Sequence, residues 1–82
     1  MEKITALVLV RLIRYTFEEF LAAVEKLPNI KRYSVITGEF DGVIEIEVDT
    51  MEKLYETFTN IEKIKGIERT NTHIVLKQFN FA

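Results

Sequence analysis

The sequence predicts a single α+β domain whose strands and helices follow the order β-α-β-β-α-β. Four segments are rich in β-branched and other apolar residues, and two further segments carry apolar residues at helical spacing. The chain has 82 residues, which is room for one hydrophobic core. Hydrophobic residues make up 48% and charged residues 29%, as in folded globular domains. We therefore expect residues 1–82 to form one domain.

The first strand is expected at residues 4–12, where both alternating sets of side chains are apolar. One set is Ala6, Val8 and Val10, and the other is Leu7 and Leu9. A strand with two apolar faces is typical of the centre of a sheet that is covered on both sides. We therefore expect this strand to be central.

The first helix is expected to begin after Thr16. Thr16 and Glu19, three residues apart, fit a capping box. Apolar residues then recur at helical spacing, namely Phe17, Phe20, Leu21, Val24 and Leu27. Pro28 and Asn29 are expected to end this helix, because proline has no N–H with which to continue it.

The second and third strands are expected at residues 30–37 and 43–48. The segment between them contains Gly38 and Gly42, two of the three glycines of the chain. Alternation places Ile44, Ile46 and Val48 on the face that should meet the helices. Glu45 and Glu47 lie on the other face, where pairing with groups such as Arg11 or Lys77 is a simpler interpretation than acid–base catalysis.

The second helix is expected to be capped by Asp49 or Thr50 and to end at Gly66. Its apolar stripe is expected to comprise Met51, Leu54, Tyr55, Phe58, Ile61 and Ile64. A last strand should cover residues 67–77. The tail that follows continues the alternation with Phe79 and Phe81, which we expect to dock on a neighbouring subunit.

Two β-α-β units with right-handed crossovers give a ferredoxin-like fold, with a four-stranded antiparallel sheet and both helices on one face. The opposite face then has no cover within the chain. Because an exposed apolar patch of this kind marks an interface, we expect a dimer that forms through the open sheet face.

The composition favours binding over catalysis. The chain has no cysteine, one histidine (His73) and one serine (Ser34), which leaves no complete set of nucleophile, base and orienting group to assemble. Motifs for metals and nucleotides are missing, so we expect no cofactor. A net charge of −2 with no basic patch argues against direct nucleic-acid binding, and no apolar run is long enough to span a membrane. We expect a cytoplasmic protein that is not an enzyme.

A family likeness rests on two stretches of sequence. The first is Thr37-Gly38-Glu39-Phe40-Asp41, and the second is Gly66 to Leu76, which contains Thr70, Thr72 and then Ile-Val-Leu. In this order around two helices, they resemble the effector-binding domain of the leucine-responsive and asparagine regulators (Lrp/AsnC), the RAM domain. The likeness spans almost the whole chain. Because the chain starts directly at the first strand, it looks like a stand-alone form that lacks the helix-turn-helix domain.

Gly42 departs from the family pattern, which more often has an apolar residue at that position. Taken alone, Asp41-Gly42 fits a tight turn. The resemblance instead implies a turn near Gly38 and Glu39, with Asp41 at the start of the third strand.

The resemblance implies an amino-acid-binding regulatory module. The implied ligand-binding residues are Gly38, Glu39, Phe40, Asp41, Thr70 and Thr72, with Asp41 pairing the ammonium group. It also implies dimers that assemble into an octamer or decamer, an effector held between dimers, and regulation of transcription through full-length Lrp/AsnC-type regulators. From the residues alone, turn formation explains Gly38 and Asp41 equally well, and strand propensity explains the threonines.

Two other classes share this fold and stay open as alternatives. Small dimeric ferredoxin-like monooxygenases or isomerases would need a polar pocket between sheet and helices, where the sequence places hydrocarbon. An ACT-type amino-acid-binding domain would need a glycine-rich turn after the first strand, where Ile13-Arg14-Tyr15-Thr16 stands.

Overall fold

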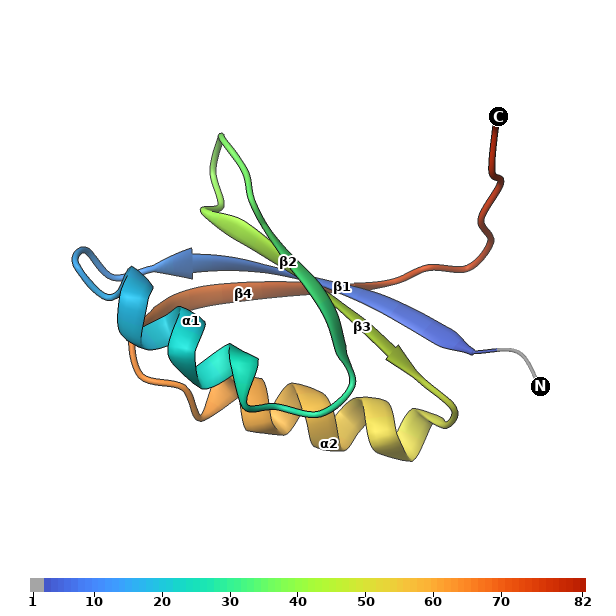
Figure 1. The fold of residues 1–82 in the computed structure, drawn as a ribbon, viewed down its shortest axis with the longest axis horizontal. Coiled ribbons are helices and arrows are strands. Elements are labelled where there is room, and N and C mark those ends of the chain that lie inside the picture. The colour runs from blue at the N-terminus through green and yellow to red at the C-terminus, as the bar shows by residue number, and fades with distance from the viewer. Residues whose placement is uncertain (1–2) are drawn as a thin grey trace.

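The computed structural model, which describes residues 3–82, contains the six elements in the order that the sequence predicts. They are β1 (Ile4–Leu12), α1 (Phe17–Glu25), β2 (Ile30–Val35), β3 (Gly42–Val48), α2 (Met51–Glu62) and β4 (Ile67–Ile74). The strands form one antiparallel sheet in the order β2-β3-β1-β4, and both helices pack on the same face of it (Figure 1). The ferredoxin-like fold is therefore confirmed, as is the central place of β1.

The core lies between the sheet and the helices. In the register of β1 and β3, Val8 is opposite Ile44 and Ala6 is opposite Ile46, so these side chains share one face. The fully or almost fully buried apolar residues are Ala6, Val8, Val10, Phe20, Val24, Ile44, Ile46, Val48, Leu54 and Ile61. Each large apolar side chain buried in this way contributes about 1.5–3 kcal/mol. The predicted inward set of β3 is confirmed.

The open face of the sheet is covered by no helix within residues 3–82. Leu7 and Leu9 of β1 are half-buried there, next to charged residues of β3. The carboxylates of Glu45 and Glu47 meet Arg32 at 3.4 Å and Lys31 at 3.5 Å. The prediction that Glu45 and Glu47 pair with Arg11 or Lys77 is wrong, because β2, which carries Lys31 and Arg32, is the strand beside β3 on that side.

The capping box at the start of α1 is not formed. The Thr16 side chain makes no cap hydrogen bond; its hydroxyl donates instead to the Ile13 carbonyl at 2.5 Å. Thr16 is held in that position because it packs against Gly66, where a Cβ would come within 2.8 Å of it. The helix ends at Glu25 rather than Leu27, in a tightened turn where the Leu27 N–H donates to Val24.

The buried stripe of α2 is rotated relative to the predicted one. Leu54, Thr57 and Ile61 are buried, whereas Met51 is 56% exposed and Tyr55 is 73% exposed. Thr57 can be buried because its hydroxyl donates to the Lys53 carbonyl at 2.8 Å. Of the two expected caps, Thr50 is the one used, and its side chain accepts a hydrogen bond from the Lys53 N–H at 3.1 Å.

Two strands are shorter than predicted. β2 ends at Val35 instead of Thr37, where the turn begins, and β4 ends at Ile74 instead of Lys77. The last contact of β4 with β1 is the hydrogen bond from the Val75 N–H to the Thr5 carbonyl, 2.9 Å long. Beyond it the chain leaves the sheet and projects from the body of the domain (Figure 1), with Leu76 96% and Phe81 92% exposed. These apolar side chains are therefore left almost wholly in solvent by the rest of residues 3–82.

Candidate functional site

The β2–β3 loop is pinned to the end of β1 by Asp41. The Ile36 N–H donates to the Asp41 carbonyl at 3.0 Å, and the Asp41 N–H donates to the Val10 carbonyl at 2.8 Å. The Leu12 N–H donates to the Asp41 carboxylate (Oδ2) at 2.7 Å. Asp41 therefore prolongs β3, and the turn lies before it, around Gly38, which has a φ of +108°. The register implied by the family is confirmed, and the tight turn at Asp41-Gly42 is wrong.

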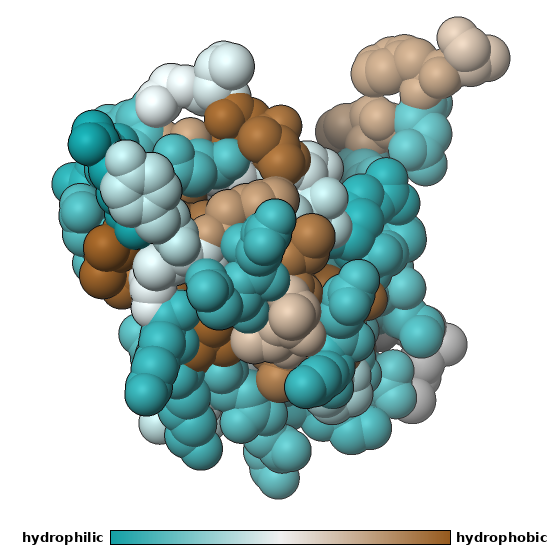
Figure 2. Space-filling model, turned by 60° about the vertical axis from the view of Figure 1, so that its left-hand side comes forward, coloured by the Kyte–Doolittle hydropathy of each residue, from teal (hydrophilic) through white to brown (hydrophobic). Residues whose placement is uncertain are grey.

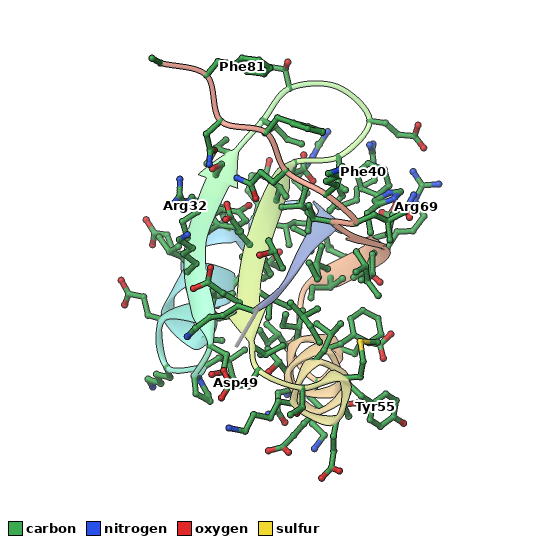
Figure 3. All side chains as sticks on the ribbon, turned by 90° about the vertical axis from the view of Figure 1, so that its right-hand side faces the viewer. Arg32, Phe40, Asp49, Tyr55, Arg69 and Phe81 are labelled. Atoms are coloured by element: carbon green, nitrogen blue, oxygen red, sulfur yellow. The ribbon has the colours of Figure 1, made fainter. Side chains whose placement is uncertain are left out.

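The tip of this loop folds over the open face of the sheet. The Glu39 carboxylate lies 2.7 Å from the Arg69 guanidinium of β4, which also stacks over the Phe40 ring at 5.3 Å. Figure 3 shows Phe40 and Arg69 side by side. The Arg11 guanidinium of β1 donates to the Glu39 carbonyl and lies 3.4 Å from the Glu68 carboxylate. The β2–β3 loop thus contacts both β1 and β4 at one end of the sheet.

Thr70 and Thr72 lie on the other side of the sheet from the loop tip. They are opposite Val10 and Val8, which are fully buried against the helices, and paired residues point to the same face. Thr70 is half-buried and Thr72 is exposed. Within one protomer the structure therefore brings together Gly38, Glu39, Phe40 and Asp41, and leaves the two threonines apart from the loop tip.

A hollow of about 310 Å³ lies next to Asp41, where the end of β1 meets the start of α1. It is lined by Leu12, Ile13, Arg14, Tyr15, Phe17, Val35, Ile36 and Asp41. Hydrophobic residues reach the surface at this end of the molecule (Figure 2); Val35 is 71% exposed and Ile13 is 51% exposed. A mostly apolar hollow whose lining includes the charged side chains of Asp41 and Arg14 suits a small molecule that has an apolar part and charged groups.

The Tyr33 side chain lies close to Asp41, over Gly42. A Cβ on Gly42 would come within 2.0 Å of the Tyr33 hydroxyl oxygen, so the absence of a side chain at residue 42 makes room for the phenol. The hydroxyl is buried and has no hydrogen-bond partner among the described residues. Burial, with a smaller contribution from the charge of Asp41, raises the pKa of Tyr33 above its ordinary value of 10.0.

The rest of the described chain offers little chemistry. His73 is exposed on the open face, opposite Leu7. Between the sheet and the helices, the buried polar groups found in residues 3–82 are the Thr57 side chain and the Tyr33 hydroxyl. No group of three metal-binding side chains occurs in that range. Neither α1 nor α2 is long and apolar enough to cross a membrane.

Sequence reasoning missed four residues at this end of the sheet. Arg11 and Arg69 hold the loop tip, Leu12 holds Asp41 through its N–H, and Tyr33 occupies the space above Gly42. One signal was present in the sequence, because Arg11 interrupts an otherwise apolar strand. The other three contacts join residues far apart in the chain and leave no local pattern.

Comparison with known proteins gives relatives along the whole domain. The HTH-type transcriptional regulator FL11 of Pyrococcus furiosus is 31% identical over 74 residues, which are 90% of this chain and 49% of that regulator. The chain thus spans about half the length of this relative. A homocitrate synthase of Sulfurisphaera tokodaii also matches, 31% identical over 52 residues, which are 63% of this chain and 11% of that enzyme.

Solved structures share the fold. TTHA0845 from Thermus thermophilus superposes with a TM-score of 0.84 at 26% identity, covering 95% of this chain and 99% of that one. The transcriptional regulator NMB0573 of Neisseria meningitidis, solved as a complex with L-Met, has a TM-score of 0.85 at 21% identity, covering 95% of this chain and 53% of that one. The family model described as the Lrp/AsnC ligand binding domain matches residues 5–81, and the chain therefore belongs to the Lrp/AsnC ligand-binding domain family.

Proposed function

We propose that this domain is a regulatory module that binds an amino acid through the β2–β3 loop and modulates transcription through Lrp/AsnC-type regulators. The observation that carries the proposal is the position of Asp41. Its carboxylate stands at the rim of the apolar hollow and is fixed there by the Leu12 N–H at 2.7 Å. A fixed carboxylate beside an apolar surface is what the ammonium group and side chain of an amino acid require.

The geometry of Asp41 leaves room for a ligand. Within residues 3–82 its carboxylate makes a single hydrogen bond, through Oδ2 to Leu12, and a carboxylate has two oxygens that accept. The ammonium of the ligand binds the same carboxylate, and the ligand side chain lies against Phe17 and Val35 in the hollow. The relatives support this ligand class, since the matching regulator of N. meningitidis was solved with L-Met.

The two threonines belong to this proposal through assembly. Because Thr70 and Thr72 lie on the other side of the sheet from the loop tip of their own protomer, we assign them to a ligand site shared between dimers, in which one subunit gives the loop and another gives the threonines. The hollow is open to solvent and rimmed by exposed apolar residues, which a neighbouring copy would cover. Ligand binding is then linked to assembly.

The dimer itself is assigned to the open sheet face. Leu7 and Leu9 form its apolar centre, and the ion pairs Lys31–Glu47 and Arg32–Glu45 form a polar rim, which is the usual anatomy of an interface. The tail with Phe79 and Phe81 docks on a neighbouring subunit. Such dimers assemble further to an octamer or decamer and co-assemble with full-length regulators.

A regulatory role fits better than an enzymatic one. The relatives with the widest coverage are transcriptional regulators, and the interior between sheet and helices is mostly hydrocarbon, with the hydrogen-bonded Thr57 and the buried hydroxyl of Tyr33 as its polar groups. The likeness to homocitrate synthase covers only 11% of that enzyme. Ferredoxin-like monooxygenases and isomerases, in contrast, need polar groups in that interior.

The test is calorimetric titration of the purified protein with the twenty amino acids, together with native mass spectrometry. We expect at least one amino acid to bind and to change the assembly mass. Asp41→Asn keeps the size of the side chain and removes its charge, and should weaken that binding at least tenfold. Asp49→Asn makes the same change at the other end of the sheet, where Asp49 forms exposed ion pairs with Lys3 and Lys53; it is the matched control and should bind as the unmodified chain does. If Asp41→Asn and Asp49→Asn bind equally well, Asp41 has only its structural role.

A further inference from the structure

The predicted ligand-binding loop already carries a bound carboxylate, and it belongs to the chain itself. We propose that Arg69, with Arg11 opposite it, forms a binding site for a monocarboxylate that Glu39 now occupies, and that the carboxylate of an incoming ligand displaces Glu39. This inference rests on the proposed function and deepens it, because it assigns the residues that recognise the second charged group of an amino acid.

Two arginines lie side by side on neighbouring strands of the sheet. Arg11 on β1 and Arg69 on β4 are directly opposite each other in the sheet register. Like charges in opposite positions of neighbouring strands destabilise a sheet unless anions offset them. The Glu39 carboxylate, 2.7 Å from Arg69, and the Glu68 carboxylate, 3.4 Å from Arg11, supply those anions. The pair of guanidinium groups is therefore a site built for negative charge.

The net charge of this cluster favours a singly charged ligand. Two guanidinium groups and two carboxylates leave this cluster neutral. Without Glu39 it would carry one positive charge, which a monoanion neutralises and a phosphate dianion overcompensates. The planar guanidinium also matches the planar carboxylate, so that a ligand carboxylate can take two hydrogen bonds where Glu39 makes one, through Oε1. The geometry thus favours a carboxylate over other anions.

The Glu39 carboxylate is held weakly enough for a ligand to displace it from Arg69. The side chains of Arg69 and Glu39 are 52% and 68% exposed, and ion pairs between exposed groups contribute about 0–1 kcal/mol. A ligand gains its contact with Arg69 at the cost of this pair alone. Its ammonium gains Asp41, two residues further along the same loop, which Glu39 does not occupy.

Displacement of Glu39 also frees the loop tip. Arg69 holds the loop twice, through the Glu39 carboxylate and by stacking over Phe40 at 5.3 Å. The Arg11 contact to the Glu39 carbonyl and the anchoring of Asp41 do not involve the Glu39 carboxylate. A ligand carboxylate on Arg69 therefore releases the Glu39 side chain and leaves the base of the loop in place. The released side chain is then available to a neighbouring subunit.

The test uses acetate as the probe, because it presents a carboxylate without an ammonium group. Acetate is titrated into the ¹⁵N-labelled full chain while the Nε–H signals of the arginines are followed by NMR. Glu39→Gln should bind acetate about two to six times more tightly than the unmodified chain, because the internal competitor, worth about 0–1 kcal/mol, is gone. The matched control is Asp49→Asn, which breaks similarly exposed ion pairs, to Lys3 at 4.0 Å and Lys53 at 3.9 Å, at the other end of the sheet. It should leave acetate binding unchanged.

Three outcomes decide the inference. Tighter acetate binding by Glu39→Gln alone, lost again when Arg69→Gln is added, supports it. Equal binding by Glu39→Gln and Asp49→Asn overturns it, as does a stronger response to inorganic phosphate than to acetate. The amino-acid titration separates this result from the proposed function. If an amino acid binds the unmodified chain and Arg69→Gln equally well, the carboxylate site is refuted and the proposed amino-acid-binding function is kept. If acetate binds as expected and no amino acid binds, the carboxylate site is kept and the proposed function is refuted.

Discussion

Replacing Gly42 by alanine should destabilise the domain through one identifiable clash. The new Cβ would lie 2.0 Å from the hydroxyl oxygen of Tyr33, 2.3 Å from its Cζ and 2.5 Å from its Cε1. No side-chain contact in a folded protein is so short, so the ring has to move. It is not free to do so, because Phe20 packs against it at 5.3 Å between ring centroids and Phe17 at 6.3 Å.

The cost follows from the size of that displacement. Inserting one carbon into a packed site that must shift typically costs about 1–3 kcal/mol. A domain of this length is expected to have a free energy of unfolding of about 4–12 kcal/mol, so the loss is a large fraction of the total. At about 4–8 °C per kcal/mol, the melting temperature should fall by roughly 5–20 °C.

The assay is urea unfolding followed by circular dichroism at one fixed protein concentration, because oligomerisation makes stability depend on concentration. A double-mutant cycle provides the control. In a Tyr33→Leu background the ring atoms above Gly42 are gone, and Gly42→Ala should then cost less than about 0.5 kcal/mol. A penalty of the same size in both backgrounds would show that the clash with Tyr33 is not its cause.

Four further changes have expected outcomes that separate structural roles. Tyr33→Phe removes a buried hydroxyl that lacks a partner among the described residues and should raise the free energy of unfolding by up to about 1 kcal/mol. Because burial raises the pKa of Tyr33 in the folded state, its contribution to stability is present below about pH 10 and is lost as pH rises through that raised pKa; Tyr33→Phe should flatten this alkaline fall in urea titrations. Thr50→Ala should cost about 1 kcal/mol in the same assay, because it removes the cap on the Lys53 N–H, and no loss would mean that α2 is capped otherwise. Leu9→Lys should give monomer or unfolded protein in light scattering, whereas a folded variant of unchanged mass would rule out the open face as the dimer interface. Deleting residues 79–82 should abolish the higher oligomer and keep the dimer in native mass spectrometry; an unchanged mass would mean that the tail packs locally.

The sequence alone determined the order of the elements and the face that β3 buries. Alternation in β3 placed Ile44, Ile46 and Val48 toward the helices, because side-chain direction in a strand repeats every two residues whatever the rest of the chain does. In β1 both alternating sets are apolar, and its register with β3 decided that Ala6 and Val8 point inward. The inward face of β3 is a local property, fixed by spacing along the chain. The turn near Gly38 came from the family resemblance, because the local pattern alone also fitted a tight turn at Asp41-Gly42.

Helix rotation and element ends were decided by the tertiary structure. Met51 and Tyr55 fit an apolar stripe, yet Tyr55 points away from α2 into solvent (Figure 3), because the satisfied hydroxyl of Thr57 lets the helix turn its threonine inward. Thr16 and Glu19 fit a capping box, yet contact with Gly66, fifty residues away, holds Thr16 elsewhere. A local pattern permits several rotations and caps, and distant neighbours choose among them.

Part of the candidate site was predicted from the sequence, and the other part is brought together only by the fold. The loop residues Gly38 to Asp41 stood together in the sequence and stand together in the fold. Thr70 and Thr72 joined them by family likeness, and the sheet register placed both threonines on the helix-covered face, because they pair with Val10 and Val8. Of the two arginines that hold the loop tip, Arg11 showed in the sequence only as an interruption of an apolar strand, and Arg69 left no local pattern. Their meeting with Glu39 depends on which strand lies beside β1 and on where the loop folds, and only the assembled sheet sets both.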